Sequence, residues 1–188
     1  MMLKVPELLK SPNFWSGLRI WGTFILLFVL KYDPAVEAFG WSVIGLWFFL
    51  FLVFTDGLDG WLARKLDRES RIGIWLDPLA DKVLVLAVLF FFWSEGTVRG
   101  WILYPLALRE IFVTVKRWAF LRRGFNMPAN RMGKLKASAE YTAAALFILG
   151  RVEFIILGNL ALAISLFLAF ASLFKFRPSM KVKEKNIT

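Results

Sequence analysis

Four aspartates in one short stretch of this sequence are the side chains best suited to chemistry. Asp56 and Asp59 follow the apolar run VIGLWFFLFLVF, and Asp77 and Asp81 come just before the apolar run VLVLAVLFFFW. The carboxylates are therefore expected at the edge of hydrocarbon. An acidic side chain placed there costs a few kcal/mol and is usually functional.

The spacing gathers these acids on two helical faces. At about 100° per residue, the first face collects acids, small residues and an arginine: Asp56, Asp59, Gly60, Ala63 and Arg64. On the following helix, Gly73, Asp77 and Asp81 form an i, i+4, i+8 row. If the two faces meet, four carboxylates converge on one volume that little side-chain bulk obstructs.

Four carboxylates in one place predict a metal site. Negative charges this close together in a low dielectric repel strongly unless cations neutralise them. Oxygen ligands alone favour a hard divalent ion, Mg²⁺ or Mn²⁺, and Mg²⁺ is usually bound together with substrate phosphates. Arg64 at the rim suits a phosphate oxygen. Helix caps or surface acids would explain single aspartates, but not two matched rows with small residues between them.

These residues also carry a family resemblance. The pattern Asp56-x2-Asp59-Gly60-x2-Ala63-Arg64-x8-Gly73-x3-Asp77-x3-Asp81 resembles, without gap or substitution, the signature of the CDP-alcohol phosphotransferases. The resemblance implies a helical membrane domain that transfers a phosphoalcohol from a CDP-alcohol to a second alcohol and releases CMP.

The resemblance also implies roles for the motif residues. Asp56, Asp59 and Asp77 would be metal ligands, and Asp81 would be the general base and a ligand of a second divalent ion. The residues expected around the CDP group are Asp56, Asp59, Gly60, Ala63, Arg64 and Gly73. The spacing alone does not decide which carboxylate is the base, and ordinary helix packing is another reason for the small residues.

The composition points to a membrane protein. The 188 residues are 59% hydrophobic, against about 45–50% in soluble domains, and the length allows one domain. Cysteine and histidine are both absent, which excludes disulfides, thiol nucleophiles and a histidine base. The net charge of +10 suits nucleic acid or an anionic membrane surface. With this hydropathy, we expect the membrane surface and no nucleic acid.

The apolar pattern predicts an all-α membrane protein with six transmembrane helices. The expected spans lie near Phe14–Leu30, Ala38–Ala63, Ile74–Trp93, Trp101–Leu121, Leu135–Leu149 and Phe154–Phe174. Most of them reach the roughly 20 residues that cross hydrocarbon. Residues 1–12 are expected as an interfacial segment, 13–175 as the catalytic domain and 176–188 as a basic tail. Asp33-Pro34 and Glu95-Gly96 are expected turns.

The cations predict the orientation. Most of the 24 lysines and arginines lie in the N-terminal segment, the second and fourth connections and the tail, whereas the alternate connections hold only Lys31, Arg99 and Arg151. By the positive-inside rule, both termini are cytoplasmic. The aspartates are then expected at the cytoplasmic face of the cell (inner) membrane. The family resemblance further implies a homodimer.

The start of the first span carries a second resemblance. Pro12-Asn13-x2-Ser16-x2-Arg19 resembles the opening of the bacterial phosphatidyl-transferring branch, which implies that Asn13 and Ser16 also contact the CDP group. A helix N-cap explains Asn13 equally well. Arg19 lies inside a span and needs an anionic partner, either a site carboxylate or a lipid phosphate.

The fourth and fifth spans indicate the acceptor. Arg109-Glu110, a basic segment and the sequence GKLK from Gly133 resemble the phosphatidylglycerophosphate synthases, which implies cations that hold an acceptor phosphate. The candidates are Arg109, Lys116, Arg117, Lys134 and Lys136, with Arg109 and Lys134 foremost. An intramembrane ion pair and a solvated basic loop are the alternatives. Those synthases often have threonine and glutamine where this chain has Ala137 and Glu140.

The resemblances together imply transfer of a phosphatidyl group from CDP-diacylglycerol to sn-glycerol 3-phosphate. Other acceptors stay open, namely inositol 1-phosphate, or phosphatidylglycerol as in a cardiolipin synthase. A cation-conducting protein is an alternative of another class. It would place acids through the depth of the membrane, whereas these acids cluster at one edge.

Overall fold

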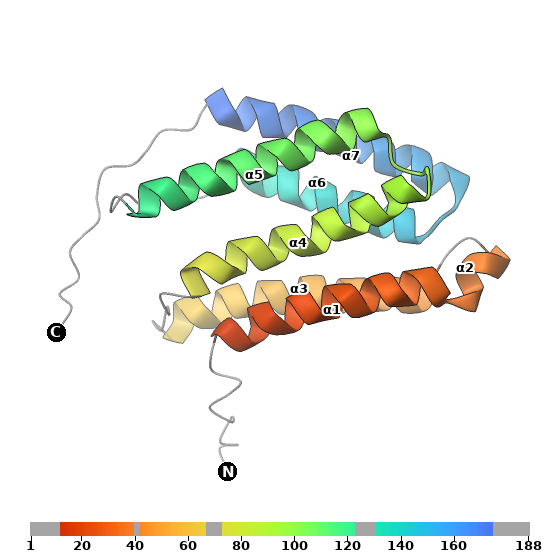
Figure 1. The fold of residues 1–188 in the computed structure, drawn as a ribbon, viewed down its shortest axis with the longest axis horizontal. Coiled ribbons are helices and arrows are strands. Elements are labelled where there is room, and N and C mark those ends of the chain that lie inside the picture. The colour runs from red at the N-terminus through yellow and green to blue at the C-terminus, as the bar shows by residue number, and fades with distance from the viewer. Residues whose placement is uncertain (1–11, 40–41, 67–72, 123–130, 175–188) are drawn as a thin grey trace, which may run out of the picture.

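Successive long helices of this computed structural model run in opposite directions (Figure 1). The structure describes residues 12–39, 42–66, 73–122 and 131–174. Within these ranges the chain is entirely helical: α1 (Pro12–Tyr32), α2 (Pro34–Phe39), α3 (Val43–Leu66), α4 (Gly73–Ser94), α5 (Gly100–Arg122), α6 (Arg131–Ile148) and α7 (Val152–Phe174). The predicted all-α fold is therefore confirmed. The expected segments 1–12 and 176–188 lie outside the described residues, apart from Pro12.

The six expected spans correspond to helices α1 and α3–α7, but the predicted start of the second span was wrong. It was expected from Ala38, whereas the structure has the separate helix α2 there and begins α3 at Val43. The side chain of Ser42 caps α3, because its Oγ accepts a hydrogen bond from the amide of Gly45 at 2.8 Å. Sequence hydrophobicity continues through this region, so it does not reveal the break.

Asp33 starts α2 and ties it to α3. Its Oδ1 accepts a hydrogen bond from the amide of Ala35 at 2.9 Å, and Pro34 occupies the first helical position. The hydroxyl of Ser42 donates to the other carboxylate oxygen of Asp33. The expected turn at Asp33-Pro34 is therefore a helix start that is bonded to the next helix.

The expected turn at Glu95-Gly96 is confirmed. Gly96 has a φ of 75°, and its amide donates to the carbonyl of Trp93 while the amide of Thr97 donates to the carbonyl of Phe92. These two bonds form a Schellman motif, which needs a residue with positive φ at the glycine position. The Schellman motif ends α4 and lets the chain reverse its direction into α5.

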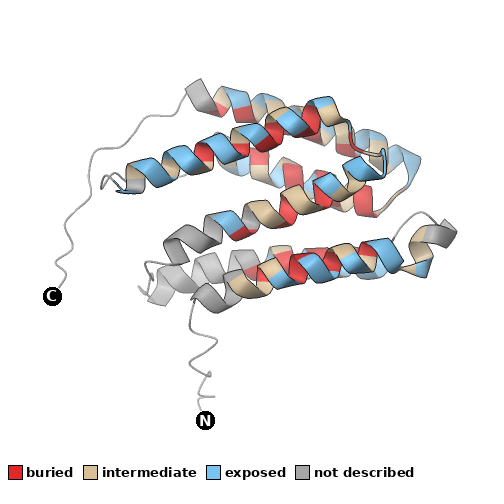
Figure 2. Cartoon of the chain, in the orientation of Figure 1, coloured by how far each residue is buried: buried red, intermediate tan, exposed pale blue. Residues whose placement is uncertain are grey.

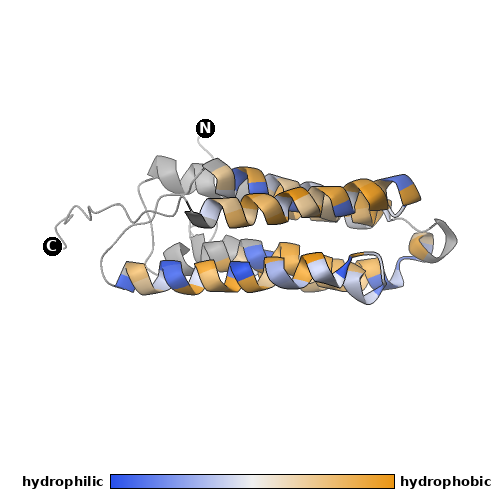
Figure 3. Cartoon of the chain, turned by 90° about the horizontal axis from the view of Figure 1, so that it is seen from above, coloured by the Kyte–Doolittle hydropathy of each residue, from blue (hydrophilic) through white to orange (hydrophobic). Residues whose placement is uncertain are grey.

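The helices form two layers, which Figure 3 shows from above. In one layer α1 packs against α3 and α4, and in the other α7 packs against α5 and α6. Helix α4 contacts α5 and α6 across the boundary, and α3 contacts α6. Two buried apolar clusters fill the interior. The larger side chains of these clusters are Leu26, Leu30, Phe49, Leu52, Leu84, Leu89, Ile102, Leu103, Leu106, Phe147 and Leu162.

Glycine at position 158 lets α7 approach α6 closely. A Cβ atom at Gly158 would lie 2.8 Å from the ring of Phe147, which is fully buried. We therefore expect Gly158→Ala to lower the free energy of unfolding by about 1–3 kcal/mol, as overpacking does. Gly17→Ala is the matched control, because nothing lies within 4 Å of its new Cβ. Thermal unfolding of both variants in detergent checks this, and equal melting temperatures would contradict it.

Several charged side chains are buried inside this bundle, and many large apolar side chains lie on its surface. Trp21 and Phe167 are 73% and 74% exposed, whereas Arg19, Glu110 and Lys136 are buried. Figure 2 shows exposed positions along the outer faces of the helices. Other large exposed apolar side chains are Phe28, Trp47, Phe54, Trp101, Leu108, Ile111, Ile156 and Leu160. An apolar surface of this extent around an interior that also holds buried charges suits hydrocarbon rather than water.

One helical stretch among the described residues is long and apolar enough to cross a membrane by length and composition alone. It is Val152–Ser172 in α7. Val43–Thr55 in α3 and Lys82–Ser94 in α4 are shorter apolar stretches. Charged side chains such as Arg19 in α1 and Glu110 in α5 interrupt the apolar character of other helices.

The alternating directions bring six helix ends to one side of the bundle, on the left in Figure 1. This side holds the start of α1, the end of α3, the start of α4, the end of α5, the start of α6 and the end of α7. We call it the motif end, because the aspartate-bearing parts of α3 and α4 belong to it.

Candidate active site

The acidic motif occupies the end of one helix and the start of the next. The last turns of α3 carry Asp56, Asp59, Gly60, Ala63 and Arg64. The first turns of α4 carry Gly73, Asp77 and Asp81. Both segments are helical, as the spacing predicted. Along each helix backbone, the motif residues therefore keep the spacing of one helical face. The side chains of all eight residues lie outside the described part, and convergence of their carboxylates stays a prediction.

Helix α1 is the partner that α3 and α4 share within their own layer. It packs against both of them, and its first turns carry Asn13 and Ser16, whose side chains lie outside the described part. Arg19 follows on α1 and is only 2% exposed. Its carbonyl accepts a hydrogen bond from the hydroxyl of Thr23 at 2.8 Å. The sequence predicted a cation inside a helix at this position, and the structure buries this arginine on the helix that packs against both acidic helices.

A buried carboxylate, Glu110, gathers three cations from three helices. Its Oε1 lies 2.5 Å from Nη1 of Arg109 and 2.7 Å from Nζ of Lys136. Its Oε2 lies 3.3 Å from Nζ of Lys82. The Glu110 side chain is about 5% exposed, so it depends on these partners to offset its lost hydration. The cluster joins α4, α5 and α6.

The cluster continues into α7 through two side chains. Lys136 also pairs with Glu140 at 2.9 Å, one turn further along α6. Glu140 Oε1 accepts a hydrogen bond from the hydroxyl of Ser165 at 3.1 Å, and Nη2 of Arg109 donates to the hydroxyl of Ser172. We call these seven residues the buried ion cluster: Lys82, Arg109, Glu110, Lys136, Glu140, Ser165 and Ser172.

The buried ion cluster carries an excess of positive charge. Among the described side chains, three cations face two carboxylates, and Arg117 adds a further positive charge within electrostatic range of Lys82. The buried Nε atoms of Arg109 and Arg117 have no hydrogen-bond partner. A buried donor without a partner costs about 1–3 kcal/mol. An excess of charge and unused donors together make this region suited to an anion.

The structure divides the five predicted acceptor-binding cations into two groups. Arg109 and Lys136 belong to the buried ion cluster, and Arg117 is half-buried near it. Lys134 and Lys116 are exposed, and Lys116 lies 5.4 Å from the ring centroid of Phe112. Lys136 is held by two carboxylates, so it is less available to a ligand than Arg109.

The GKLK segment lies near the start of a helix. The sequence predicted that it opens the fifth span, and a solvated basic loop was the alternative for its lysines. The structure begins α6 at Arg131, so Gly133, Lys134 and Lys136 lie within the helix. Two residues apart on a helix, the two lysines point in different directions, which explains why one is exposed and the other buried.

Sequence reasoning missed part of the cluster. Lys82 was left without a role, although a lysine beside an apolar span needs a partner. Glu140 was noted only as a departure from related sequences. Its i, i+4 spacing from Lys136 was the available signal.

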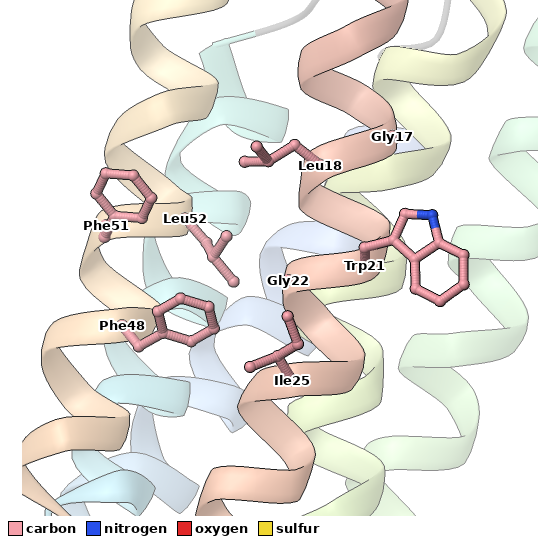
Figure 4. Close-up of a pocket in the computed structure, with 8 residues that line it drawn as sticks. All are labelled: Gly17, Leu18, Trp21, Gly22, Ile25, Phe48, Phe51 and Leu52. Atoms are coloured by element: carbon pink, nitrogen blue, oxygen red, sulfur yellow. The ribbon is translucent and has the colours of Figure 1, made fainter.

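An apolar groove of about 610 Å³ runs between the middle part of α1 and the first half of α3 (Figure 4). In the close-up, Leu18 and Ile25 of α1 lie across from Phe48 and Leu52 of α3. The full lining is Gly17, Leu18, Trp21, Gly22, Ile25, Phe48, Phe51 and Leu52. The groove offers aliphatic and aromatic contacts one to two turns from Asp56.

The donor set fits a hard divalent ion. Among the side chains that the structure describes, no group of three acids, histidines or cysteines is placed to hold a metal. The four motif aspartates lie outside that set, and they are carboxylates on two neighbouring helix ends. Oxygen-only donors without cysteine or histidine suit Mg²⁺ or Mn²⁺.

These features define a class of protein: a helical bundle with an apolar exterior and, at one end, an acidic motif beside a buried excess of cations. The comparison with known families agrees with it. The family model described as CDP-alcohol phosphatidyltransferase matches residues 9–171. The chain belongs to the CDP-alcohol phosphatidyltransferase family. Members of this family generally use divalent metal ions.

Curated relatives carry more specific names. A probable phosphatidylglycerophosphate synthase of Mycobacterium tuberculosis is 35% identical over 141 residues, which cover 73% of this chain and 65% of the relative. CDP-diacylglycerol–glycerol-3-phosphate 3-phosphatidyltransferases of Bacillus subtilis and Pectobacterium atrosepticum are 34% and 38% identical. The matches cover 63% and 68% of this chain, and 63% and 73% of those relatives. The chain thus spans slightly less than two thirds of the mycobacterial and Bacillus relatives.

Proposed function

We propose that this protein transfers a phosphatidyl group from CDP-diacylglycerol to sn-glycerol 3-phosphate, which yields phosphatidylglycerophosphate and CMP. The family match and the names of the relatives support the reaction class. The observation that carries the choice of a phosphorylated acceptor is the buried ion cluster, whose Lys82 directly follows Asp81 of the acidic motif.

The nucleotide half of the site is assigned to α3, α4 and the start of α1. Asp56, Asp59 and Asp77 would hold a divalent ion, Mg²⁺ or Mn²⁺, and Asp81 would contribute to a second. Bound there, the metal supplies charge neutralisation for the diphosphate and for the departing CMP. The residues proposed to surround the CDP group are Asn13, Ser16, Gly60, Ala63, Arg64 and Gly73.

The chemical step is a substitution at phosphorus. The primary hydroxyl of the acceptor forms a bond to the phosphorus that carries diacylglycerol, while the bond from that phosphorus to the CMP oxygen breaks. Asp81 accepts the hydroxyl proton, and CMP keeps the bonding electron pair and leaves. A positioned carboxylate base contributes typically 10²–10⁴-fold. This role suits a chain without histidine or cysteine.

The acceptor half of the site is assigned to α5 and α6. Arg109 has a buried Nε without a partner, which makes it the first choice for the acceptor phosphate, because guanidinium groups bind phosphate in a directed way. Arg117, Lys116, Lys134 and Lys136 would complete the positive field. A phosphorylated acceptor brings negative charge to these cations and a neutral alcohol does not, so the cluster favours a phosphorylated one.

The membrane setting is part of the proposal. Six long helices of alternating direction (Figure 1) and the apolar exterior support six crossings, with both termini in the cytoplasm and the motif end at the cytoplasmic face of the inner membrane. There a soluble phosphate ester and CMP can enter and leave. A homodimer in the membrane is included by family resemblance.

The test is transfer by the purified chain in detergent micelles. With CDP-diacylglycerol and Mg²⁺ or Mn²⁺, we expect sn-glycerol 3-phosphate to release CMP at least about tenfold faster than glycerol, inositol 1-phosphate or phosphatidylglycerol does. That ratio corresponds to about 1.4 kcal/mol of transition-state preference. CMP is quantified by chromatography and the lipid product by mass spectrometry. Equal rates with glycerol would contradict a phosphate-binding acceptor site, and rates that do not change with EDTA would contradict the metal.

A further inference from the structure

Among the side chains that the structure describes, the partners of the Lys82 ammonium group all lie on α5. Lys82 Nζ lies 3.3 Å from the carbonyl oxygen of Glu110 and 3.3 Å from its carboxylate Oε2. It also donates to the hydroxyl of Thr114. That hydroxyl gives its own proton to the Glu110 carbonyl at 2.7 Å, so its lone pairs are free to face the lysine.

These contacts use the full capacity of the lysine. An ammonium group has three donors and no acceptor, and α5 offers it three oxygens. The Lys82 side chain is 24% exposed, so most of its stem and head lie between the helices. A substrate phosphate would have to displace at least one of these partners to reach it. Its geometry therefore favours a role in holding helices over a role in binding substrate.

Lys82 stands between the two halves of the proposed site. It follows Asp81 directly on α4, in the layer with α1 and α3. Its partner Glu110 lies in the other layer and forms ion pairs with the adjacent Arg109 and with Lys136. A single side chain thus connects the helix that bears the proposed base with the helix and cations assigned to the acceptor.

We propose that Lys82 is a positioning residue that fixes the helix of the acidic motif relative to the acceptor cations. The inference rests on the proposed function. The Lys82 contacts restrict rotation and sliding of α4 against α5 near Asp81. An error of about 1 Å between reacting groups can cost about 10²-fold in rate without weakening the binding of either substrate. Loss of the Lys82 side chain should therefore lower kcat rather than raise KM.

The experiment compares Lys82→Met with the matched control Lys31→Met. Lys31 is exposed in the last turn of α1, away from the motif end, and lies over the ring of Tyr32. We expect Lys82→Met to lower kcat for CMP release about 10–100-fold and to leave KM for both substrates within about threefold. The increase in melting temperature on addition of CMP and Mg²⁺ should persist, because the metal ligands stay in place. Lys31→Met should match the wild type in all three measurements.

A second variant covers the case in which Lys82→Met does not fold. Thr114→Val removes one acceptor and keeps every charge, and we expect it to lower kcat about 3–10-fold with unchanged KM values. Wild-type turnover in either folded variant would overturn the inference. So would a selective rise in KM for the acceptor at unchanged kcat, which would make Lys82 a substrate ligand. If the wild-type chain itself transfers to no alcohol, the proposed function fails instead.

Discussion

Asp77→Asn is expected to abolish phosphatidyl transfer, leaving less than about 1% of wild-type turnover. Asparagine keeps the size and the helix position of the side chain but removes the negative charge that a divalent ion requires. Loss of one electrostatic contribution at a reacting phosphoryl centre costs about 10²–10³-fold. The measurement is CMP release from CDP-diacylglycerol with sn-glycerol 3-phosphate at saturating Mg²⁺ or Mn²⁺.

Metal binding itself provides the second measurement for Asp77→Asn. CMP with Mg²⁺ should raise the melting temperature of the wild type, because a ligand that binds only the folded state stabilises it. The variant should lose this increase. Glu95→Gln is the control, since it removes a carboxylate that is exposed at the other end of the bundle. Near-normal turnover in purified Asp77→Asn would contradict the assignment of a metal site to the motif.

The helical architecture could be predicted almost completely from the sequence. Apolar runs of about 20 residues, separated by short polar connections, defined the six long helices to within a few residues at most ends. The break between α2 and α3 was the exception. It depends on Ser42, whose hydroxyl accepts from Gly45 and donates to Asp33, and such a tertiary hydrogen bond has no signature in hydrophobicity.

The candidate site was only partly predictable, for a related reason. The acids of α3 and α4 are spaced three or four residues apart, so the sequence alone shows that they share a helical face. The partners of Lys82 are Glu110 and Thr114, which lie 28 and 32 residues further along the chain. No local period links residues so far apart. Their pairing follows from the crossing of α4 and α5, which only the folded arrangement supplies.

Glu110→Ala is expected to be the most destabilising substitution in the bundle interior. It would leave Lys82, Arg109 and Lys136 without their shared carboxylate, and Glu140 alone cannot neutralise them. Removing one partner of a buried ion pair typically costs about 3–5 kcal/mol, because the remaining charge stays buried. The measurement is the free energy of unfolding in mixed micelles. Glu153→Ala, which removes an exposed carboxylate from the first turn of α7, is the control.

A double-mutant cycle separates the ion pair from general loss of packing around Glu110. If the pair of Glu110 with Lys136 at 2.7 Å matters, then adding Lys136→Met to Glu110→Ala should restore part of the lost stability. The coupling between contacting charged residues is expected at about 0.5–3 kcal/mol. Strictly additive effects would show that the two side chains do not interact. The double variant should still transfer poorly, because without Glu110 the Arg109 guanidinium and the Lys82 ammonium lose the carboxylate that positions them.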